Sequence, residues 1–245
     1  MRIGRTSRAW NRPGDGLRRS LAAMSDTEAA EPSTARAAVD RPLEVPSNAA
    51  LLDAALVAFA EQGYEGTSVR RLARDLGVHH NHIPQRFGSK ERLWYAAVDH
   101  GFGIVYRDLM QAFGEPFPDE LSRLRAMVVR FIEINAERPA LLRIVNSEAV
   151  IGGPRLEYLF NSYIEPVRRY GSRVLSKLEA RGEVNTSSAG ILYFLMASGA
   201  GGPIVFPGLA ERLGVGLDPA DPDAVHELAV QTVDVLFDGV RRRPG

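Results

Sequence analysis

The chain has 245 residues, of which 45% are hydrophobic, so it is long enough to bury a substantial core as one large domain or two small ones. It contains no cysteine, which excludes disulfides, thiolate metal ligands and a cysteine nucleophile and fits a reducing cytoplasm. Its 30 basic and 30 acidic residues cancel, so only a local cluster of charge is able to indicate a nucleic-acid partner. The composition therefore predicts a cytoplasmic globular protein.

The first 46 residues mix Arg, Ala, Ser, Pro and acidic residues without helical or strand periodicity. Such a composition buries too little apolar surface to offset the entropy of ordering, so residues 1 to 46 are predicted to form a disordered basic tail. No apolar stretch follows the N-terminal arginines, so a signal peptide is not expected. Met24 follows the arginine-rich portion, and a translation start there is a hypothesis.

Residues 47 to 94 show the apolar spacing of several short helices, and they are predicted to form one domain. Ser47 is expected to cap the first helix and Gly63 to end it, and Thr67 is expected to cap the second, which ends at Gly77. Each helix has apolar residues at i, i+3, i+4 and i+7: Leu52, Ala55, Leu56 and Phe59 in the first, and Val69, Leu72, Ala73 and Leu76 in the second. The spacing therefore predicts two amphipathic helices joined by a short turn.

A third, brief helix follows the Gly77 turn, with Ile83 and Phe87 as its large apolar residues. Ser89 is expected to cap a fourth helix. Two short helices joined by a glycine-containing turn, the second polar on its outer face, are typical of a helix-turn-helix that reads the major groove of DNA. Residues 48 to 98 are therefore predicted to form a DNA-binding head.

The charge of this segment supports a DNA contact, because six basic and only two acidic residues lie between positions 70 and 92. Amide side chains such as Gln85 are suited to reading adenine, whereas lysine and helix N-termini are suited to phosphate. The predicted DNA-binding residues are Thr67, Ser68, Arg70, His79, His80, Asn81, His82, Gln85, Arg86 and Lys90.

The segment from Leu51 to Val69, followed by Leu-Ala-Arg-Asp-Leu-Gly-Val and Phe-Gly-Ser-Lys-Glu, resembles the DNA-binding head of the TetR family over about fifty residues. The resemblance implies an all-α homodimer that represses transcription from a palindromic operator until a small ligand binds its C-terminal domain. One residue departs from the family, because Pro84 stands where an aromatic residue usually contacts phosphate. A proline near the middle of so short a helix is expected to bend its C-terminal half or turn it partly into a 3₁₀-helix.

The three histidines at positions 79, 80 and 82 also allow a metal-binding interpretation. No carboxylate or further histidine stands at ligand spacing, so we predict no metal site and no cofactor. An enzyme is disfavoured as well, because the sequence has no phosphate-binding loop, nucleophile elbow or metal-ligand spacing.

Residues 95 to 245 are predicted to form a C-terminal helical domain for ligand binding and dimerisation, and the whole chain is placed in the all-α class. Pro166 is expected to kink a long helix or to start a new one. Residues 184 to 210 lack charge, but prolines and glycines interrupt them, so they are expected to be buried in protein rather than in a membrane. The candidate ligand-binding residues are Phe131, Asn146, Tyr158, Tyr163 and Tyr170.

Dimerisation is assigned to the small-residue helix of residues 191 to 202 and to the last helix, which supplies Val225, Leu228, Val233 and Leu236. A buried core within one monomer is the alternative interpretation of these residues. An alternative for the whole chain is an accessory DNA-binding protein whose C-terminal domain only dimerises. A cavity in that domain would favour the ligand-controlled regulator.

Overall fold

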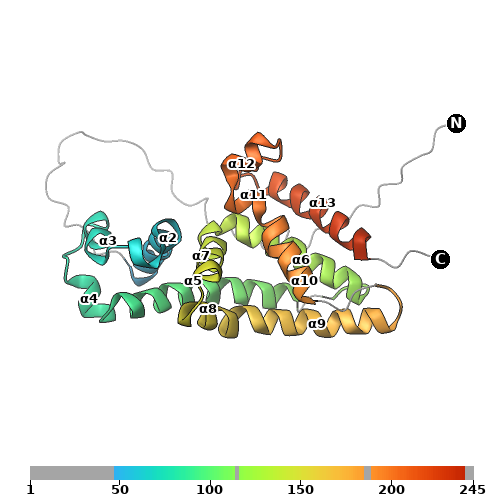
Figure 1. Cartoon of the computed structure of the whole chain (residues 1–245), viewed down its shortest axis with the longest axis horizontal. Coiled ribbons are helices and arrows are strands. Elements are labelled where there is room, and N and C mark those ends of the chain that lie inside the picture. Colours follow the sequence, from blue (N-terminus) through green and yellow to red (C-terminus); the bar gives the residue numbers. More distant parts are fainter. Residues whose placement is uncertain (1–46, 114–115, 185–188, 241–245) are drawn as a thin grey trace, which may run out of the picture. The chain divides into compact units, whose positions relative to one another are not determined.

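The structure is a computed structural model, and it describes residues 47 to 113, 116 to 184 and 189 to 240. These residues belong to one compact unit of the chain, residues 45 to 245, and the elements that they form are all helical (Figure 1). The predicted tail, residues 1 to 46, lies outside the described residues. The all-α prediction is confirmed for the described part of the chain.

Four helices follow one another in the predicted head: α2 (Asn48–Gly66), α3 (Val69–Asp75), α4 (His82–Phe87) and α5 (Lys90–Phe113). The Ser47 side chain accepts a hydrogen bond from the Ala50 N–H at 3.2 Å, and Ser89 accepts one from Arg92 at 3.1 Å, so both predicted caps are confirmed. Gly77 has a φ of 67°, which residues with a Cβ rarely adopt, and this allows the abrupt turn between α3 and α4.

The head is held together by one apolar core. Its largest members are fully buried and come from α2, α4 and α5, and they include Phe59, Ile83 and Trp94. The same core continues into α7 (Pro139–Ile151) and α8 (Pro154–Leu159) through Leu141 and Leu159. The predicted domain boundary between residues 94 and 95 falls inside α5, so a single helix crosses it. That boundary stays a prediction.

Beyond α5 the chain forms a second group of helices around its own core (Figure 1). Besides α7 and α8, they are α6 (Glu120–Glu137), the π-helix η1 (Phe160–Ile164), α9 (Glu165–Ala180), α10 (Ala189–Phe194), the π-helix η2 (Leu195–Ala200), α11 (Gly202–Val205), α12 (Pro207–Arg212) and α13 (Pro222–Val240). Pro166 lies in the first turn of α9, as expected of a residue that starts a new helix.

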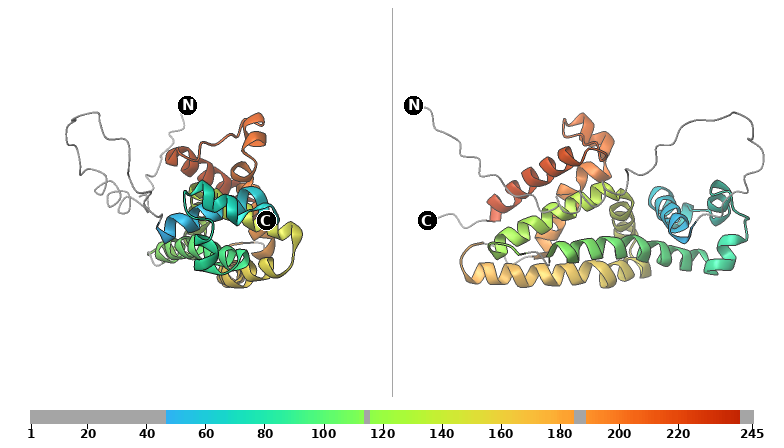
Figure 2. Two further views of the ribbon diagram at one scale, coloured as in Figure 1. Left: turned by 90° about the vertical axis from the view of Figure 1, so that its left-hand side faces the viewer. Right: turned by 180° about the vertical axis from the view of Figure 1, so that it is seen from behind.

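Helices α6 and α13 pack side by side, and Figure 2 shows this pair from two further directions. Arg125 of α6 forms an ion pair with Asp234 of α13. Val225 and Val233 are buried in the core that this pair shares, so the prediction that they form the dimer interface is wrong. Their apolar side chains pack within one chain, which agrees with the alternative interpretation of a buried core inside one monomer.

The described part of the uncharged segment, residues 184 and 189 to 210, contains α10, η2, α11 and part of α12, and a proline stands in the first turn of both α11 and α12. None of the helices in the described ranges is both long enough and apolar enough to cross a membrane.

Candidate nucleic-acid interface and pocket

The polar surface of the head is formed by α4, by the three residues that precede it and by the start of α3. Ile83 is the buried residue of α4 and fixes this helix to the head core, which leaves Gln85 and Arg86 exposed. The exposed members of the predicted DNA-binding set are Ser68, Arg70, His79, His80, Asn81, Gln85 and Arg86. The structure thus brings these side chains together on one part of the head, whereas their contacts with DNA stay a prediction.

His79, His80 and Asn81 form the turn that leads into α4 rather than the first turn of the helix. The His79 Nδ1 atom accepts a hydrogen bond from the Asn81 N–H at 3.3 Å, so this nitrogen is unprotonated in the arrangement seen. The His79 and His80 rings lie 4.1 Å apart, and the His82 ring is partly buried. In the described ranges, no group of three or more His, Cys, Asp or Glu side chains lies close enough to hold a metal ion.

Pro84 has a different effect from the one expected. It is the third residue of α4, where a helical N–H has no acceptor within the helix, so its missing N–H interrupts no hydrogen bond. Residues 82 to 87 are α-helical throughout, and the Gly88 N–H donates to the Pro84 carbonyl at 2.8 Å. The expected bend or 3₁₀ segment is therefore absent from this described helix, and that prediction is wrong.

Thr67 does not cap α3. The Ser68 side chain accepts the capping hydrogen bond from the Arg71 N–H at 3.3 Å, whereas Thr67 ends α2 and its side chain is only 3% exposed. The Thr67 hydroxyl lies 2.7 Å from the Gly63 carbonyl oxygen and 3.1 Å from that of Ala58, so its proton is used within the head. The N-cap prediction for Thr67 is wrong by one residue, and a side-chain contact from Thr67 to DNA has no support from this geometry.

Lys90, the first residue of α5, has a defined environment. Its Nζ atom donates to the Glu65 carbonyl at 3.2 Å and lies 4.7 Å from the centroid of the Tyr64 ring. Ser89 caps the same helix end, so an ammonium group and free backbone N–H groups are close to each other there. This is the kind of site that a DNA phosphate group occupies.

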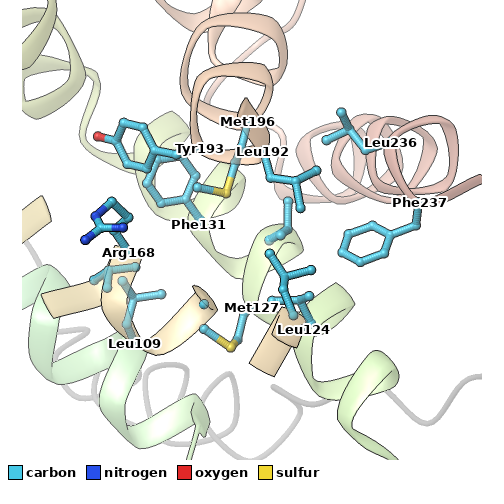
Figure 3. Close-up of a pocket in the computed structure, with 14 residues that line it drawn as sticks. Leu109, Leu124, Met127, Phe131, Arg168, Leu192, Tyr193, Met196, Leu236 and Phe237 are labelled. Atoms are coloured by element: carbon cyan, nitrogen blue, oxygen red, sulfur yellow. The ribbon is translucent and has the colours of Figure 1, made fainter. Parts of the chain in front are cut away.

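An apolar pocket, partly open to solvent, lies between α5, α6, α9, α10, η2 and α13. Figure 3 shows the side chains that line it; they are almost all aliphatic or aromatic, and Arg168 and Tyr193 supply the polar groups. Arg168 is engaged by Glu165, whose two carboxylate oxygens lie 2.5 and 2.7 Å from its Nε and Nη2 atoms. Glu165 also lies 3.5 Å from the Nη2 atom of Arg169, so one carboxylate faces two guanidinium groups in the first turn of α9.

A second pocket lies against the first, and Leu109, Phe131, Val167 and Tyr193 line both. Tyr193 is placed at this junction by α10, and burial raises the pKa of its hydroxyl to about 12. Sequence reasoning missed this residue, although an aromatic side chain with a polar tip inside an uncharged segment was an available signal.

The predicted ligand-binding residues are divided by the structure. Phe131 lines both pockets and Tyr163 lines the second. The hydroxyls of Tyr158 and Tyr163 donate hydrogen bonds to the Asp99 Oδ1 atom of α5, at 2.5 and 2.6 Å. Tyr158 is not among the residues that line either pocket, and neither are Asn146 and Tyr170.

The pKa of the Tyr158 hydroxyl is raised to about 12, chiefly by burial and also by its hydrogen bond to Asp99. Burial and the same carboxylate also raise the pKa of Tyr163. Both hydroxyls therefore keep their protons at neutral pH and hold α8 and η1 against α5.

Comparison with known proteins places the predicted head in a family. Residues 51 to 97 match the model of bacterial regulatory proteins of the tetR family. The HTH-type transcriptional regulator RutR of Escherichia coli is 30% identical over 107 residues, which cover 44% of this chain and 50% of RutR. The chain thus spans about half the length of the curated relatives it matches.

Solved structures extend the likeness to the C-terminal helices. The ketosteroid transcriptional regulator KstR2 of Mycobacterium tuberculosis has a TM-score of 0.64 at 18% identity, with 82% of this chain and all of KstR2 covered. The fatty acid degradation regulator FadR of Bacillus halodurans has a TM-score of 0.59 at 16% identity, with 78% of this chain and 98% of FadR covered. These structures confirm the predicted fold, a helix-turn-helix head followed by a helical C-terminal domain, and the family match confirms the resemblance inferred from the head. Residues 51 to 97 are thus similar to the bacterial regulatory proteins of the tetR family, and the helices that follow share the fold of the solved regulators.

Proposed function

We propose that the chain is a sequence-specific DNA-binding regulator that acts as a cytoplasmic homodimer on a palindromic operator and is released by a small apolar effector. The observation that carries this proposal is the exposed polar surface around α4, which rests on a buried apolar core. Its base-facing candidates, His80 and Gln85, are exposed, and so are Arg70 and Arg86 of the neighbouring helices. The match of residues 51 to 97 to the tetR family model supports a regulator over an enzyme.

The two pockets support control by an effector over the alternative of a domain that only dimerises. A filled helical core would favour the alternative, whereas two adjoining apolar pockets lie between these helices. Almost all of the side chains that line the first pocket are aliphatic or aromatic, which favours an apolar ligand. The names of KstR2 and FadR, regulators connected with ketosteroids and with fatty acid degradation, agree with an apolar class of effector.

A dimer is supported by apolar side chains that the chain leaves exposed on α10, η2 and α13. Two copies of the head are needed to read two half-sites that lie one DNA turn, about 34 to 36 Å, apart. Helices η2 and α13 contact each other, so their exposed side chains contribute to one surface. The exposed residues on these three helices are Ile191, Phe194, Leu195, Val230 and Val235.

Selection from random double-stranded DNA with the purified full chain tests the proposal. We expect enrichment of a palindrome. Replacing His80 or Gln85 by alanine should change the preferred bases. Lys90→Ala should instead weaken binding to all sequences alike and lower the salt slope of log K by about one. Lys177→Ala, at an exposed lysine of α9, is the matched control.

Failure to enrich any palindrome would contradict the proposed function. Equal, sequence-independent losses from the variants at His80, Gln85 and Lys90 would contradict the assignment of base-reading and phosphate-binding roles.

A further inference from the structure

Tyr64, near the end of α2, has two cationic side chains over its ring. The guanidinium carbon of Arg155 lies 3.9 Å from the ring centroid, and the Nζ atom of Lys90 lies 4.7 Å from it. A cation over an aromatic ring is attracted by the negative potential of the ring face. A single uncharged ring therefore connects α8, which carries Arg155, with the first residue of α5.

Both cations are also held from their other side. Lys90 donates to the Glu65 carbonyl at 3.2 Å, and the Arg155 Nε atom donates to the Glu148 Oε1 atom at 2.9 Å. Glu148 is only 1% exposed, and within the described residues its second carboxylate oxygen has no hydrogen-bond partner. Because Arg155 is the cation that pairs with this buried carboxylate, moving Arg155 away would leave a buried charge uncompensated.

The pair of Glu148 and Arg155 spans the joint between α7 and α8. Gly152 and Gly153 form this joint with φ values of 76° and 92°, which side chains with a Cβ rarely adopt. Helix α8 continues directly into η1, where Tyr163 lines the second pocket. The place of Arg155 over the ring is thus set by helices of the C-terminal domain.

We propose that Arg155 and Tyr64 are positioning residues for Lys90, and that they hold its ammonium group in place for a DNA backbone phosphate. The inference rests on the proposed function, because it concerns the DNA contact of the same head. Lys90 has three N–H groups and uses one for the Glu65 carbonyl, so two are left for phosphate oxygens. A long side chain that is already held in place loses less conformational freedom when DNA binds.

The test measures binding of the full chain to a random-sequence DNA duplex over a range of salt concentrations, which needs no known operator. We expect Arg155→Gln and Tyr64→Leu each to weaken binding by about threefold to tenfold, the range of a cation–π contact. Tyr64→Phe keeps the ring and should bind like the unchanged chain. Arg155→Lys keeps the charge but not the planar guanidinium, so its loss should be smaller than that of Arg155→Gln.

Combination with Lys90→Gln separates positioning from a structural role. Lys90→Gln alone should lower the salt slope by about one. Adding Tyr64→Leu or Arg155→Gln to it should cause little further loss, because the residue that they position is gone. The salt slope reports the number of phosphate contacts made by cations. Tyr64 has no charge, so a lower salt slope in Tyr64→Leu alone would mean that a neighbouring cation had lost its phosphate contact.

The control is Arg173→Gln, at an exposed arginine of α9, and the midpoint of thermal unfolding is recorded for every variant. Losses that add to that of Lys90→Gln would overturn the inference, and so would folded Arg155→Gln and Tyr64→Leu variants that bind normally. If Tyr64→Leu does not fold, the comparison of Arg155→Gln with Arg155→Lys decides. Absence of DNA binding by the unchanged chain would instead contradict the proposed function.

Discussion

At the scale of single residues, Tyr193 shows how burial controls a polar group in the pocket wall. Its hydroxyl lies where the two pockets meet, and burial raises its pKa to about 12 from an ordinary value of about 10. The folded chain therefore keeps this proton over a range of pH in which the unfolded chain releases it. The proton bound in the folded state makes the free energy of unfolding fall as the pH rises.

The contribution of Tyr193 should be fully present below pH 10 and be lost between pH 10 and 12, with a total of about 3 kcal/mol at most. We expect Tyr193→Phe to flatten this part of the pH dependence, because phenylalanine does not ionise in either state. Urea denaturation of both proteins at a series of alkaline pH values measures the difference. If the free energy of unfolding changed with pH in the same way for both proteins, the raised pKa would not belong to Tyr193.

The sequence placed the N-caps of the head helices to within one residue. Gly63, which was expected to end the first helix, has a non-helical φ of 69°, but α2 continues to Gly66. The predicted roles of Thr67 and Pro84 were wrong. Thr67 and Ser68 are adjacent hydroxyl residues, and either is able to cap α3. The choice depends on the Ala58 carbonyl, which the fold brings close to Thr67 from nine residues earlier. The role of Pro84 likewise depends on α4 beginning at His82, and helix ends are the least certain part of a periodic pattern.

At the scale of elements, α5 crosses from the head into the C-terminal domain and meets α2 and α7 at Gly101. A Cβ atom added at Gly101 would lie 2.8 Å from the Cδ2 atom of Leu56 and 2.8 Å from that of Leu141. Both leucines are buried. The close approach of the three helices therefore depends on the missing side chain.

We expect Gly101→Ala to lower the free energy of unfolding by up to about 2 kcal/mol, because the cost of shifting the overpacked leucines, about 1 to 3 kcal/mol, is partly offset by the helical preference of alanine, about 0.5 to 1 kcal/mol. Gly103→Ala is the matched control, since no atom lies within 4 Å of a Cβ added there. Alanine at that helical position should raise stability by about 0.5 to 1 kcal/mol. Urea denaturation with an unchanged m value measures both, and equal stabilisation by the two variants would contradict the close packing.

The pockets could be predicted only in part, because their walls come from helices far apart in the sequence. Phe131 and Tyr163 were found as aromatic residues on predicted helices. Periodicity does not reveal which face of a helix points into a cavity, so Tyr193 was missed. The Asp99 carboxylate that binds Tyr158 lies 59 residues earlier in the chain, and no local pattern connects the two.

At the scale of the whole molecule, the exposed apolar residues of α10, η2 and α13 are not explained by the folded monomer. Phe194 is 71% exposed and Val235 is 75% exposed, although α13 buries its opposite face in the core. The sequence prediction assigned dimerisation to residues 191 to 202 and to the last helix, but Val225 and Val233, which it named on α13, face the core. Exposed side chains of both helices, rather than Val225 and Val233, are therefore the candidates for contact with a second copy.

We expect Phe194→Glu and Val235→Glu each to raise the dissociation constant of the dimer by about a hundredfold, because each loses roughly 3 kcal/mol of apolar burial and places a charge in the interface. Sedimentation velocity over a range of protein concentrations measures this. The matched control is Val150→Glu, at a valine of α7 that is 88% exposed and lies outside the three helices. Both substitutions should also lower the apparent affinity for the operator, because one head reads only half of the palindrome. This affinity should recover at high protein concentration, where the dimer forms again. If both variants stayed dimeric, the interface would lie elsewhere. The same would follow if the control variant dissociated as much as they do.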